Sequence, residues 1–339
     1  MPPPIAVVTG GAGFIGSHMV DLLLGQGYRV RVIDNLSGGR AENLAHHKTN
    51  PDLALDVRDI TGLNCGDGLF KDADYIFHFA GIGDIVPSIE RPVSYLNTNV
   101  MGTVRTLEAA RSAGVKKFVY ASSSSCYGLA AELPTTEDCP IDPQYPYALS
   151  KYMGEQAVFH WGRVYRTPVV SIRIFNAYGP RSRTSGAYGA VFGVFLKQKL
   201  ANQPFTVVGD GEQTRDFVFA TDLARAFWLG AISDRTNEIY NVGAGRPQSV
   251  NKLVELLGGG SVVHLPKRPG EPDCTWADIA KIKAQLGWSP QVPLEEGVAV
   301  MLKHIDYWKN APLWDPVSIA AATQTWFKAL STEALCDQR

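Results

Sequence analysis

Tyr147 and Lys151 are the side chains of this 339-residue sequence whose types and spacing most directly predict chemistry. The pattern around them predicts a helix from Tyr147 to about Arg163, and residues four apart on a helix share one face. A free tyrosine has a pKa of about 10, too high for a base at neutral pH. One positive charge about 4 Å away, at an effective dielectric of about 20, contributes about 4 kcal/mol, or roughly three pKa units, although burial acts in the opposite direction. The pair is therefore a candidate proton-transfer site, with an ordinary amphipathic helix start as the alternative.

A glycine-rich loop follows the first predicted strand. Ile5–Thr9 is apolar and β-branched, as expected of a strand buried on both faces. Gly10-Gly-Ala-Gly13-Phe-Ile-Gly16 then leads into a helix pattern that reaches about Gln26. Gly10 permits a tight turn, Gly13 lets the backbone approach a pyrophosphate, and Gly16 lets the helix pack on the strand. The helix N-terminus offers free N–H groups to the phosphates of a dinucleotide.

A carboxylate ends the second predicted strand, Arg29–Ile33, about twenty residues after the loop. Asp34 can accept hydrogen bonds from ribose hydroxyls and would repel a 2′-phosphate, so the sequence favours NAD over NADP. The alternative for Asp34 is a turn residue before Asn35.

Strands and helices alternate along the first half of the chain. Further strands are predicted at Leu53–Leu55, Asp74–Ala80, Lys116–Ala121 and Thr167–Ile174, and a helix at Asn97–Ala113. This alternation predicts an α/β fold with a Rossmann-like, doubly wound parallel sheet, whose ligands bind at the carboxyl ends of the strands. Asp56 and Val57 could border an adenine there. The run Ser122–Ser125 supplies candidate catalytic hydroxyls, with a serine-rich turn as the alternative.

Composition and charge argue against several classes of function. The formal net charge is −1 and 45% of residues are hydrophobic, so we expect neither a nucleic-acid surface nor a membrane span. No signal peptide is expected. The five cysteines (Cys65, Cys126, Cys139, Cys274 and Cys336) are scattered and form no Cys-x-x-Cys pair. Their pattern predicts reduced thiols in a cytoplasmic protein, without a disulfide framework or a metal site.

With these motifs in this order, the chain resembles the extended short-chain dehydrogenase/reductase superfamily and, within it, the NAD-dependent nucleotide-sugar (UDP-sugar) 4-epimerases. The resemblance implies that Ser123, Tyr147 and Lys151 are catalytic, with Ser123 hydrogen-bonded to the reacting sugar hydroxyl. Related dehydratases carry an Asp-Glu pair at the positions of Ser124 and Ser125, and related decarboxylases usually carry a glutamate at the second. The expected reaction is therefore oxidation and re-reduction at one carbon.

The resemblance also implies the binding residues. NAD is expected to contact Gly10, Gly13, Phe14, Ile15, Gly16, Asp34, Asn35, Ser37, Asp56, Val57, Phe79, Ala80, Gly81, Asn99, Tyr147, Lys151 and Phe175. A UDP-sugar is expected to contact Ser124, Ser125, Asn176, Ala190, Val191, Thr206, Val208, Arg215, Arg268 and Thr275. The guanidinium groups of Arg215 and Arg268 suit diphosphate oxygens, with solvated surface charges as the alternative.

Two residues bear on which class of sugar the pocket accepts. Thr275 stands where, in the family, a bulky tyrosine restricts the pocket to plain hexoses and a small residue admits an N-acetyl group; uronic-acid epimerases can also carry threonine there. Arg183 differs from the hexosamine enzymes, and it could pair with a sugar carboxylate or be a surface charge. A plain hexose, an N-acetylhexosamine and a uronic acid all stay open as the sugar. A related epimerase or reductase acting on another nucleotide or carbon and a non-catalytic NAD-binding sensor also stay open.

Three segments are expected along the chain. Residues 1–175 form an NAD-binding domain, and residues 176–310 form mainly a smaller mixed α/β substrate domain, with some segments returning to the first. The family resemblance fades after Trp308, and residues 311–339 are expected to add a C-terminal helical extension. Family precedent implies a homodimer paired through the helices near Asn97–Ala113 and Tyr147–Arg163.

Overall fold

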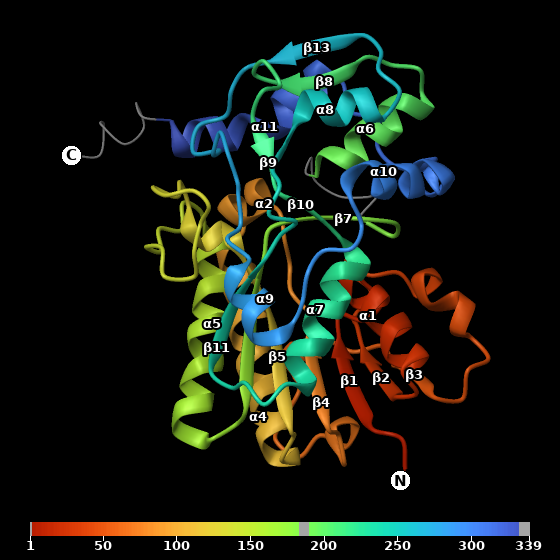
Figure 1. Cartoon of the computed structure of the whole chain (residues 1–339), viewed down its shortest axis with the longest axis vertical. Coiled ribbons are helices and arrows are strands. Elements are labelled where there is room, and N and C mark those ends of the chain that lie inside the picture. The colour runs from red at the N-terminus through yellow and green to blue at the C-terminus, as the bar shows by residue number, and fades with distance from the viewer. Residues whose placement is uncertain (1, 183–189, 332–339) are drawn as a thin grey trace.

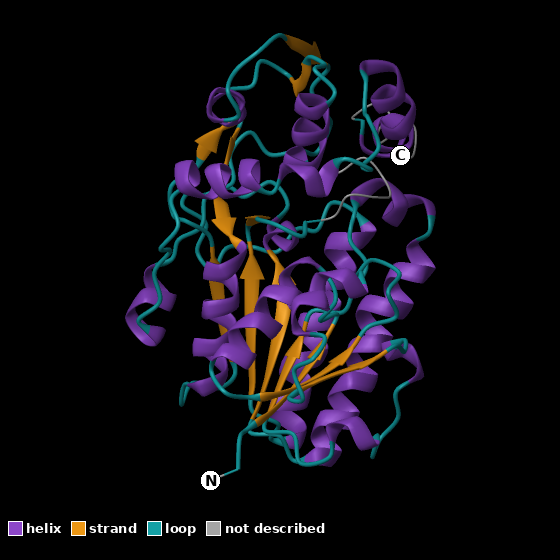
Figure 2. Cartoon of the chain, turned by 90° about the vertical axis from the view of Figure 1, so that its right-hand side faces the viewer, coloured by secondary structure: helices purple, strands orange, loops and turns teal. Residues whose placement is uncertain are grey.

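The computed structural model describes residues 2–182 and 190–331. Its centre is a seven-stranded sheet in which every neighbouring pair of strands is parallel (Figures 1 and 2). The strands, in spatial order, are β11 (Glu238–Val242), β6 (Val169–Ile174), β5 (Lys117–Ser123), β4 (Tyr75–His78), β1 (Ile5–Thr9), β2 (Arg29–Ile33) and β3 (Leu53–Asp56). The strand order reverses between β1 and β4, which is where such sheets bind ligands. The prediction of a Rossmann-like doubly wound sheet is confirmed.

The strand that carries the serine run is longer than its sequence predicted. We expected it to end at Ala121, but Ser122 and Ser123 continue the ladder by pairing with Arg173 and Ile174 of β6. Strand pairing in the sheet centre outweighs the weak β propensity of serine. Ser123 is therefore the last residue of a core strand rather than part of a turn.

Helices cover both faces of the sheet (Figure 2). The contacts pair α1 (Phe14–Gly25) with α7 (Ala220–Ile232), and α4 (Thr103–Ala113) with α5 (Pro146–Tyr165). Before α4 lie α2 (Ile85–Glu90), α3 (Pro92–Leu96) and a π-helical segment, Asn97–Gly102. Short 3₁₀ segments are Ala41–His47, Ile60–Gly62, Gly68–Phe70, Ser124–Tyr127 and Ile305–Trp308. The expected helix from Asn97 to Ala113 is thus π-helical in its first part, a distortion that often accompanies functional sites.

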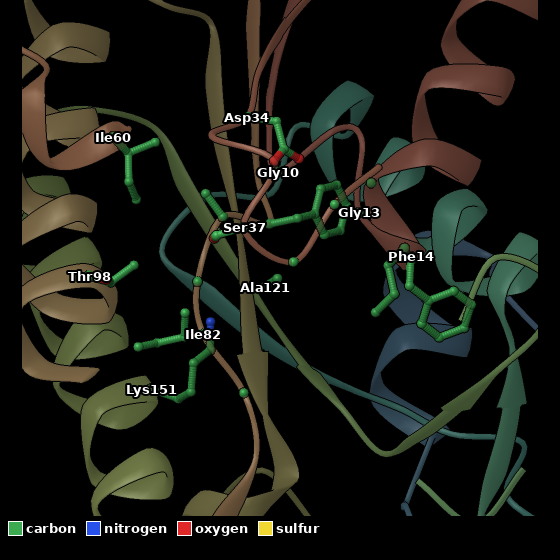
Figure 3. Close-up of a pocket in the computed structure, with 18 of the residues that line it drawn as sticks. Gly10, Gly13, Phe14, Asp34, Ser37, Ile60, Ile82, Thr98, Ala121 and Lys151 are labelled. Carbon is green, nitrogen blue, oxygen red and sulfur yellow. The ribbon is translucent and has the colours of Figure 1, made fainter. Parts of the chain in front are cut away.

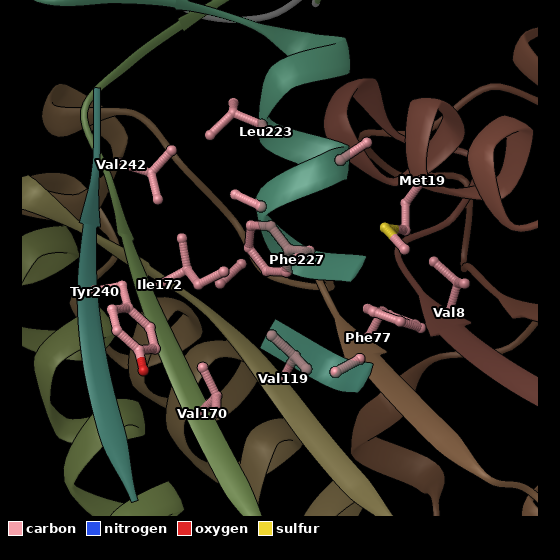
Figure 4. Packing of buried hydrophobic residues seen from close by; sticks show 14 of the residues in the cluster. Val8, Met19, Phe77, Val119, Val170, Ile172, Leu223, Phe227, Tyr240 and Val242 are labelled. Atoms are coloured by element: carbon pink, nitrogen blue, oxygen red, sulfur yellow. The ribbon is translucent and has the colours of Figure 1, made fainter. Parts of the chain in front are cut away.

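The core beneath α1 and α7 joins distant parts of the chain. Figure 4 shows Met19 of α1 beside Leu223 and Phe227 of α7, over the sheet residues Val8, Phe77, Val119, Val170 and Ile172. Burying one such side chain contributes about 1.5–3 kcal/mol. This packing holds α7, which follows the second half's β10 (Phe217–Phe219), firmly on the first half.

The second half forms a smaller lobe beyond the carboxyl ends of the strands (Figure 1). Its two-stranded sheets pair β7 (Asn176–Tyr178) with β10, β9 (Thr214–Arg215) with β12 (Gln248–Ser249), and β8 (Phe205–Val208) with β13 (Val262–Leu265). Its helices include α6 (Val191–Leu200), α8 (Val250–Leu256) and α10 (Leu294–Lys303), while α9 (Ala280–Leu286) packs on β11. The lobe has its own core, which includes Tyr178, Phe195, Leu253 and Trp308.

Within the described residues, the C-terminal extension contains the helix α11 (Pro316–Leu330). It starts five residues after the expected Ala311, because Asp315 and Ser318 form a capping box and Pro316 occupies the first helical position. The helix contacts α2 of the first half (Figure 1).

None of the helices in the described ranges combines the length and apolar character needed to cross a bilayer. The four cysteines within those ranges, Cys65, Cys126, Cys139 and Cys274, are free thiols.

Candidate functional site

A cavity of about 490 Å³ opens at the carboxyl ends of the central strands (Figure 3). It brings together most of the predicted cofactor and catalytic residues: Gly10, Gly13, Phe14, Ile15, Gly16, Asp34, Asn35, Ser37, Phe79, Ala80, Gly81, Ser123, Tyr147, Lys151 and Phe175. Residues from strands far apart in the sequence thus line one continuous site.

The glycine loop packs without room for side chains. Gly10 has φ +69°, and a Cβ there would lie 2.7 Å from the backbone nitrogen of Ala80. A Cβ on Gly16 would overlap the carbonyl oxygen of Gly10, so the third glycine is needed by the loop itself as well as by the helix. Helix α1 begins after Gly13, which directs its N-terminus at the cavity.

Asp34 lies at the cavity wall and also holds the glycine loop. Its carboxylate accepts hydrogen bonds from the backbone N–H groups of Ala12 (3.0 Å) and Leu36 (2.8 Å), and burial raises its pKa. Figure 3 shows the carboxylate beside the loop. Asp34 therefore fits both interpretations of the sequence: it organises a turn, and it presents its charge at the rim of the cavity.

The residues predicted to border an adenine lie next to the cavity lining rather than in it. Asp56 and Val57 are not among the residues lining the cavity, which are Arg58, Asp59 and Ile60 at this end. Asp56 instead forms an ion pair with Arg58 (2.8 Å), and the Val57 side chain is largely exposed. Contacts of Asp56 and Val57 with a cofactor remain predictions.

The catalytic candidates meet where β5 ends and α5 begins. The Ser123 hydroxyl acts on the phenol of Tyr147 and lowers its pKa, and its Oγ lies 2.8 Å from Oγ of Ser125. The backbone N–H of Ser125 also donates to Ser123 Oγ (3.2 Å). Ser124 and Ser125 do not line the cavity, and both belong to the 3₁₀ turn behind Ser123. Ser125 therefore orients the Ser123 hydroxyl from the side away from the cavity.

The pKa values of the pair differ from the sequence expectation. Enclosure raises the pKa of Tyr147, and the hydrogen bond from Ser123 lowers it without reversing the change. Burial lowers the pKa of Lys151 to about 8, opposed by the charge of Glu155. The Lys151 ammonium lies 4.6 Å from the ring centroid of Tyr120. For both side chains, the effect of burial on the pKa is therefore larger than the charge effect that the spacing of Tyr147 and Lys151 suggested.

A buried ion pair beneath the site was not apparent from the sequence. Glu155, one turn after Lys151 on α5, accepts a 2.7 Å hydrogen bond from Nη2 of Arg173 on β6. Ser171 also donates to Glu155 (2.8 Å), and Arg173 donates to the phenol oxygen of Tyr127 (2.8 Å). The only sequence signal for this network is the placement of charged residues at buried helix and strand positions. It fastens the catalytic helix to the sheet.

A second feature missed by the sequence reading is the segment Ile82–Asp84, which follows the predicted Gly81. Asn99 accepts from the backbone N–H of Ile82 (2.8 Å) and donates to its carbonyl (3.0 Å), and the hydroxyl of Tyr95 donates to the carbonyl of Gly83. Asn99 is thus buried behind the loop rather than in the cavity wall. Asp84 adopts φ +79°, a costly conformation for a non-glycine residue that often marks a functional position. Its carboxylate raises the pKa of Tyr147.

On the sugar side, Asn176 and Thr275 are in direct contact. The hydroxyl of Thr275 donates to Oδ1 of Asn176 (2.6 Å) and accepts from the backbone N–H of Asp216 (3.2 Å). The buried Asp216 carboxylate accepts bonds from the backbone of Ala244 (2.6 Å) and Ala277 (2.9 Å). Asn176 lies between the cavity-lining Phe175 and Ala177, so the Thr275 contact is placed beside the catalytic cavity.

The two predicted phosphate arginines converge on one carboxylate. Nη2 of Arg215 lies 2.9 Å from Glu271, and Nη1 of Arg268 lies 3.6 Å from it. The structure brings the arginines together from separate segments of the second half, and their contacts with a diphosphate remain predictions.

The remaining predicted substrate residues lie around α6 and β8. Ala190 is the N-cap of α6 and Val191 its first residue. The side chain of Thr206 accepts a bond from Gln198 (2.8 Å) and is buried, whereas Val208 lines a second cavity. Arg183 lies outside the described residues.

The pattern of the NAD-dependent epimerase/dehydratase family matches residues 6–243. The chain belongs to that family. It is 38% identical over 318 residues to a UDP-glucose 4-epimerase of Mycolicibacterium smegmatis, which covers 90% of this chain and 98% of the relative. This relationship makes the protein an NAD-dependent nucleotide-sugar epimerase.

Two solved structures are similar to this chain over about nine tenths of its length. One is a UDP-N-acetylglucosamine 4-epimerase of Methanobrevibacter ruminantium in complex with UDP-N-acetylmuramic acid (TM-score 0.83, 32% identity, 90% of this chain and 100% of that chain). The other is a UDP-glucuronic acid 4-epimerase of Bacillus cereus in complex with UDP-glucuronic acid and NAD (TM-score 0.81, 32% identity, 90% and 99%). Both are covered almost completely, so about a tenth of this chain has no counterpart in them.

The epimerase cavity fits NAD. The loop between β1 and α1 has no room for side chains, the N-terminus of α1 faces the site, and the Asp34 carboxylate lies at its rim. Oγ of Ser122 is buried in the cavity wall without a hydrogen-bond partner among the described residues, as expected where a bound molecule supplies the partner.

One group of side chains in the described ranges could hold a metal ion: Asp21, His46 and His47. Nε2 of each histidine lies within 2.9 Å of Oδ1 of Asp21, and the second carboxylate oxygen pairs with the guanidinium of Arg181. The neighbouring positive charge opposes a divalent cation, and the group lies outside the epimerase cavity.

Proposed function

We propose that this epimerase inverts carbon 4 of a UDP-sugar through a 4-keto intermediate. The observation that carries the proposal is the meeting of Ser123, Tyr147 and Lys151 at one wall of the cofactor cavity. Serines at positions 124 and 125 cannot act as the carboxylate acid and base of a dehydratase. The side chains therefore favour proton and hydride transfer at one carbon without loss of water or of carbon dioxide.

Each catalytic side chain has a defined task in this reaction. NAD, when bound, supplies the hydride acceptor and donor. Tyr147, as a phenolate, takes the proton of the sugar 4-hydroxyl and later returns it. Ser123 hydrogen-bonds the sugar hydroxyl, and the Lys151 ammonium, four residues after Tyr147 on α5, favours the phenolate. The keto-sugar stays bound while it turns about its phosphate bonds and presents its opposite face.

The proposed sugar is a neutral hexose, plain or N-acetylated. The small side chain of Thr275, held against Asn176, leaves room for an N-acetyl group. The carboxylate of Asp84 lines the cavity near Tyr147. A uronic acid is the second candidate, because the chain is similar to the UDP-glucuronic acid 4-epimerase of Bacillus cereus.

A cytoplasmic homodimer is also proposed. Exposed apolar side chains gather on the helices that the family resemblance assigns to subunit pairing: Val93 on α3, Met101 in the π-helical segment, and Leu149 and Met153 on α5. Residues 149 and 153 are four apart and share a face of α5. A second copy would remove these side chains from water.

The test is to incubate purified protein, without added NAD, with UDP-hexoses, UDP-N-acetylhexosamines and UDP-uronic acids, and to resolve the products by NMR. Interconversion of a hexose or N-acetylhexosamine pair at carbon 4 is expected. Interconversion of uronic acids alone would replace the neutral sugar with the second candidate. The proposal fails if no UDP-sugar is converted even with NAD supplied.

The matched variants are Tyr147→Phe and Tyr165→Phe, which remove phenol oxygens at the start and end of the same helix. The first should lose about 10²–10⁴-fold in kcat, the usual size of a general acid–base contribution. The second should retain activity because Tyr165 is exposed and distant from the cavity lining. A non-catalytic NAD-binding sensor would be indifferent to both.

A further inference from the structure

A second phenol lies beside the tyrosine of the proposed reaction. The rings of Tyr145 and Tyr147 are nearly parallel, with 7° between their planes and 6.5 Å between their centroids. Tyr145 is the residue that precedes α5, and Pro146 is the first residue of that helix. Tyr145 is half-buried and does not line the catalytic cavity. Its hydroxyl can therefore influence the reaction only through groups that do line the cavity.

The contacts of Ser125 with Ser123 determine where the Ser123 proton can point. The backbone N–H of Ser125 donates to Oγ of Ser123 (3.2 Å). The Oγ atoms of the two serines lie 2.8 Å apart, so one hydroxyl donates to the other. A serine hydroxyl has one proton and two acceptor lone pairs. When Ser125 is the donor, it occupies both lone pairs of Ser123, and the Ser123 proton is left for the phenol of Tyr147 or the sugar.

Tyr145 favours this direction of donation. The Ser125 hydroxyl acts on the phenol of Tyr145 and lowers its pKa, but burial raises that pKa by more. Because a free tyrosine already has a pKa of about 10, the Tyr145 phenol keeps its proton at neutral pH and is a hydrogen-bond donor. When it donates to Ser125, the Ser125 proton has Oγ of Ser123 as an acceptor within 2.8 Å. Hydrogen bonds that run in one direction along such a chain strengthen one another.

We propose that Tyr145 is a positioning residue for the epimerisation, because its hydroxyl donates to Ser125 and so directs the Ser123 proton toward the catalytic phenol. The inference rests on the proposed function, which makes the phenolate of Tyr147 the active base. A phenolate that accepts a directed hydrogen bond is stabilised relative to the phenol. Tyr145 thus supports the base from outside the cavity.

Other titratable groups also surround the two phenols, from several elements of the chain: Asp84, Tyr95, Tyr120, Cys126, Lys151 and Glu271. The charge of Asp84 raises the pKa of Tyr147, and the charge of Glu271 raises that of Tyr145. Removing the neutral Tyr145 hydroxyl leaves these charges in place. A change in the Tyr147 pKa of such a variant therefore reports on the serine chain.

The first test removes the hydroxyl and keeps the ring. Tyr145→Phe preserves the stacking on Tyr147, so bound NAD, Tm and KM should match the wild type. The acidic limb of the kcat profile should shift to higher pH, and kcat below the limb should fall about two- to tenfold, the size of one net hydrogen bond. Tyr165→Phe, at the exposed end of the same helix, is the matched control and should leave the profile unchanged. An unshifted limb in Tyr145→Phe would overturn the inference.

A second variant tests the route through the serine pair. Ser125→Ala removes the intermediate hydroxyl and should shift the acidic limb in the same direction as Tyr145→Phe. Combining the two substitutions should add nothing to the shift of Ser125→Ala, because the phenol then has no hydroxyl to act through. Additive shifts would overturn the proposed route.

A spectroscopic measurement gives the Tyr147 pKa without turnover. The tyrosinate absorbance of the purified protein with its bound NAD is titrated against pH, and the same titration after adding Tyr147→Phe is subtracted in each background. Tyr145→Phe should raise this pKa and Tyr165→Phe should not; an equal pKa in both would overturn the inference. A raised pKa in Tyr145→Phe, with no UDP-sugar converted by the wild type, would overturn the proposed function instead, so the two failures are distinguishable.

Discussion

The carboxylate of Glu155 and the guanidinium of Arg173 form an ion pair directly behind the catalytic helix, 2.7 Å apart, with side chains 0% and 3% exposed. The pair joins α5 to β6, so it holds the helix that carries Tyr147 and Lys151 against the strand next to Ser123. The charge of Glu155 also raises the pKa of Lys151, against the effect of burial. Structural support and electrostatic adjustment of the site therefore come from the same carboxylate.

Glu155→Gln should lower the free energy of unfolding by about 3–5 kcal/mol, because it leaves the Arg173 charge buried without a counter-ion. Urea denaturation measures the loss. Glu255→Gln is the control, since Glu255 is 70% exposed in its pair with Lys252 and should cost less than about 1 kcal/mol. Equal losses in the two variants would contradict the assigned role of the buried pair.

Ser123→Ala and Asp84→Asn should move the pH dependence of kcat in opposite directions. The Ser123 hydrogen bond lowers the pKa of Tyr147 and the Asp84 charge raises it. Because the phenolate is the active form in the proposed reaction, the acidic limb of the profile should shift to higher pH in Ser123→Ala and to lower pH in Asp84→Asn. Shifts in the same direction would show that a group other than Tyr147 controls the acidic limb of the kcat profile.

Lys151→Met should change how stability depends on pH. Burial lowers the pKa of Lys151 from 10.5 to about 8, so between these values the unfolded chain binds a proton that the folded chain does not. The free energy of unfolding of the wild type should therefore rise with pH across this window relative to Lys151→Met, by roughly 3 kcal/mol. Chemical denaturation at pH 7 to 10.5 measures the difference, and a constant difference would refute the buried, low-pKa ammonium.

Thr275→Tyr should narrow the range of sugars that the enzyme accepts as substrates. A phenol ring at this position would occupy the space beside Asn176, where Thr275 now makes a 2.6 Å hydrogen bond. The kcat/KM for a UDP-N-acetylhexosamine should fall at least about tenfold more than that for the plain UDP-hexose, the size expected of steric exclusion in a pocket. Thr275→Ser is the control that keeps the hydroxyl. Equal losses of kcat/KM for both sugars would show that the N-acetyl group does not bind beside residue 275.

Met153→Glu should convert a dimer into monomers. Met153 is 41% exposed on the proposed pairing face, and a two-fold interface would bring two introduced carboxylates into the same apolar surface. Light scattering measures the mass. Ile232→Glu, 44% exposed at the end of α7 on the other side of the sheet, should leave the mass unchanged. A monomeric wild type would refute the pairing.

Local signals were sufficient for the cofactor half. Three of its features can be recognised from their immediate neighbours in the sequence: the buried strand Ile5–Thr9, the glycine loop after it, and Asp34. Each either constrains its own backbone or directly follows a strand. The same holds for Tyr147 and Lys151, whose four-residue spacing on a helix places them in one site. Strand ends were less predictable: Ser122 and Ser123 stay in β5 because of their partners on β6, not because of their own propensity.

By itself, the sequence predicted the fold class and the cofactor loop and named the candidate catalytic side chains, since these depend on residue type and on spacing within one element. Only the tertiary structure decided that Glu155 pairs with Arg173, that Asp84 is held beside Tyr147, and that α11 closes over Arg268. The direction of the Tyr147 pKa change was likewise settled by enclosure. Desolvation and long-range pairing depend on which distant segments surround a side chain, and the folded chain alone brings those segments together.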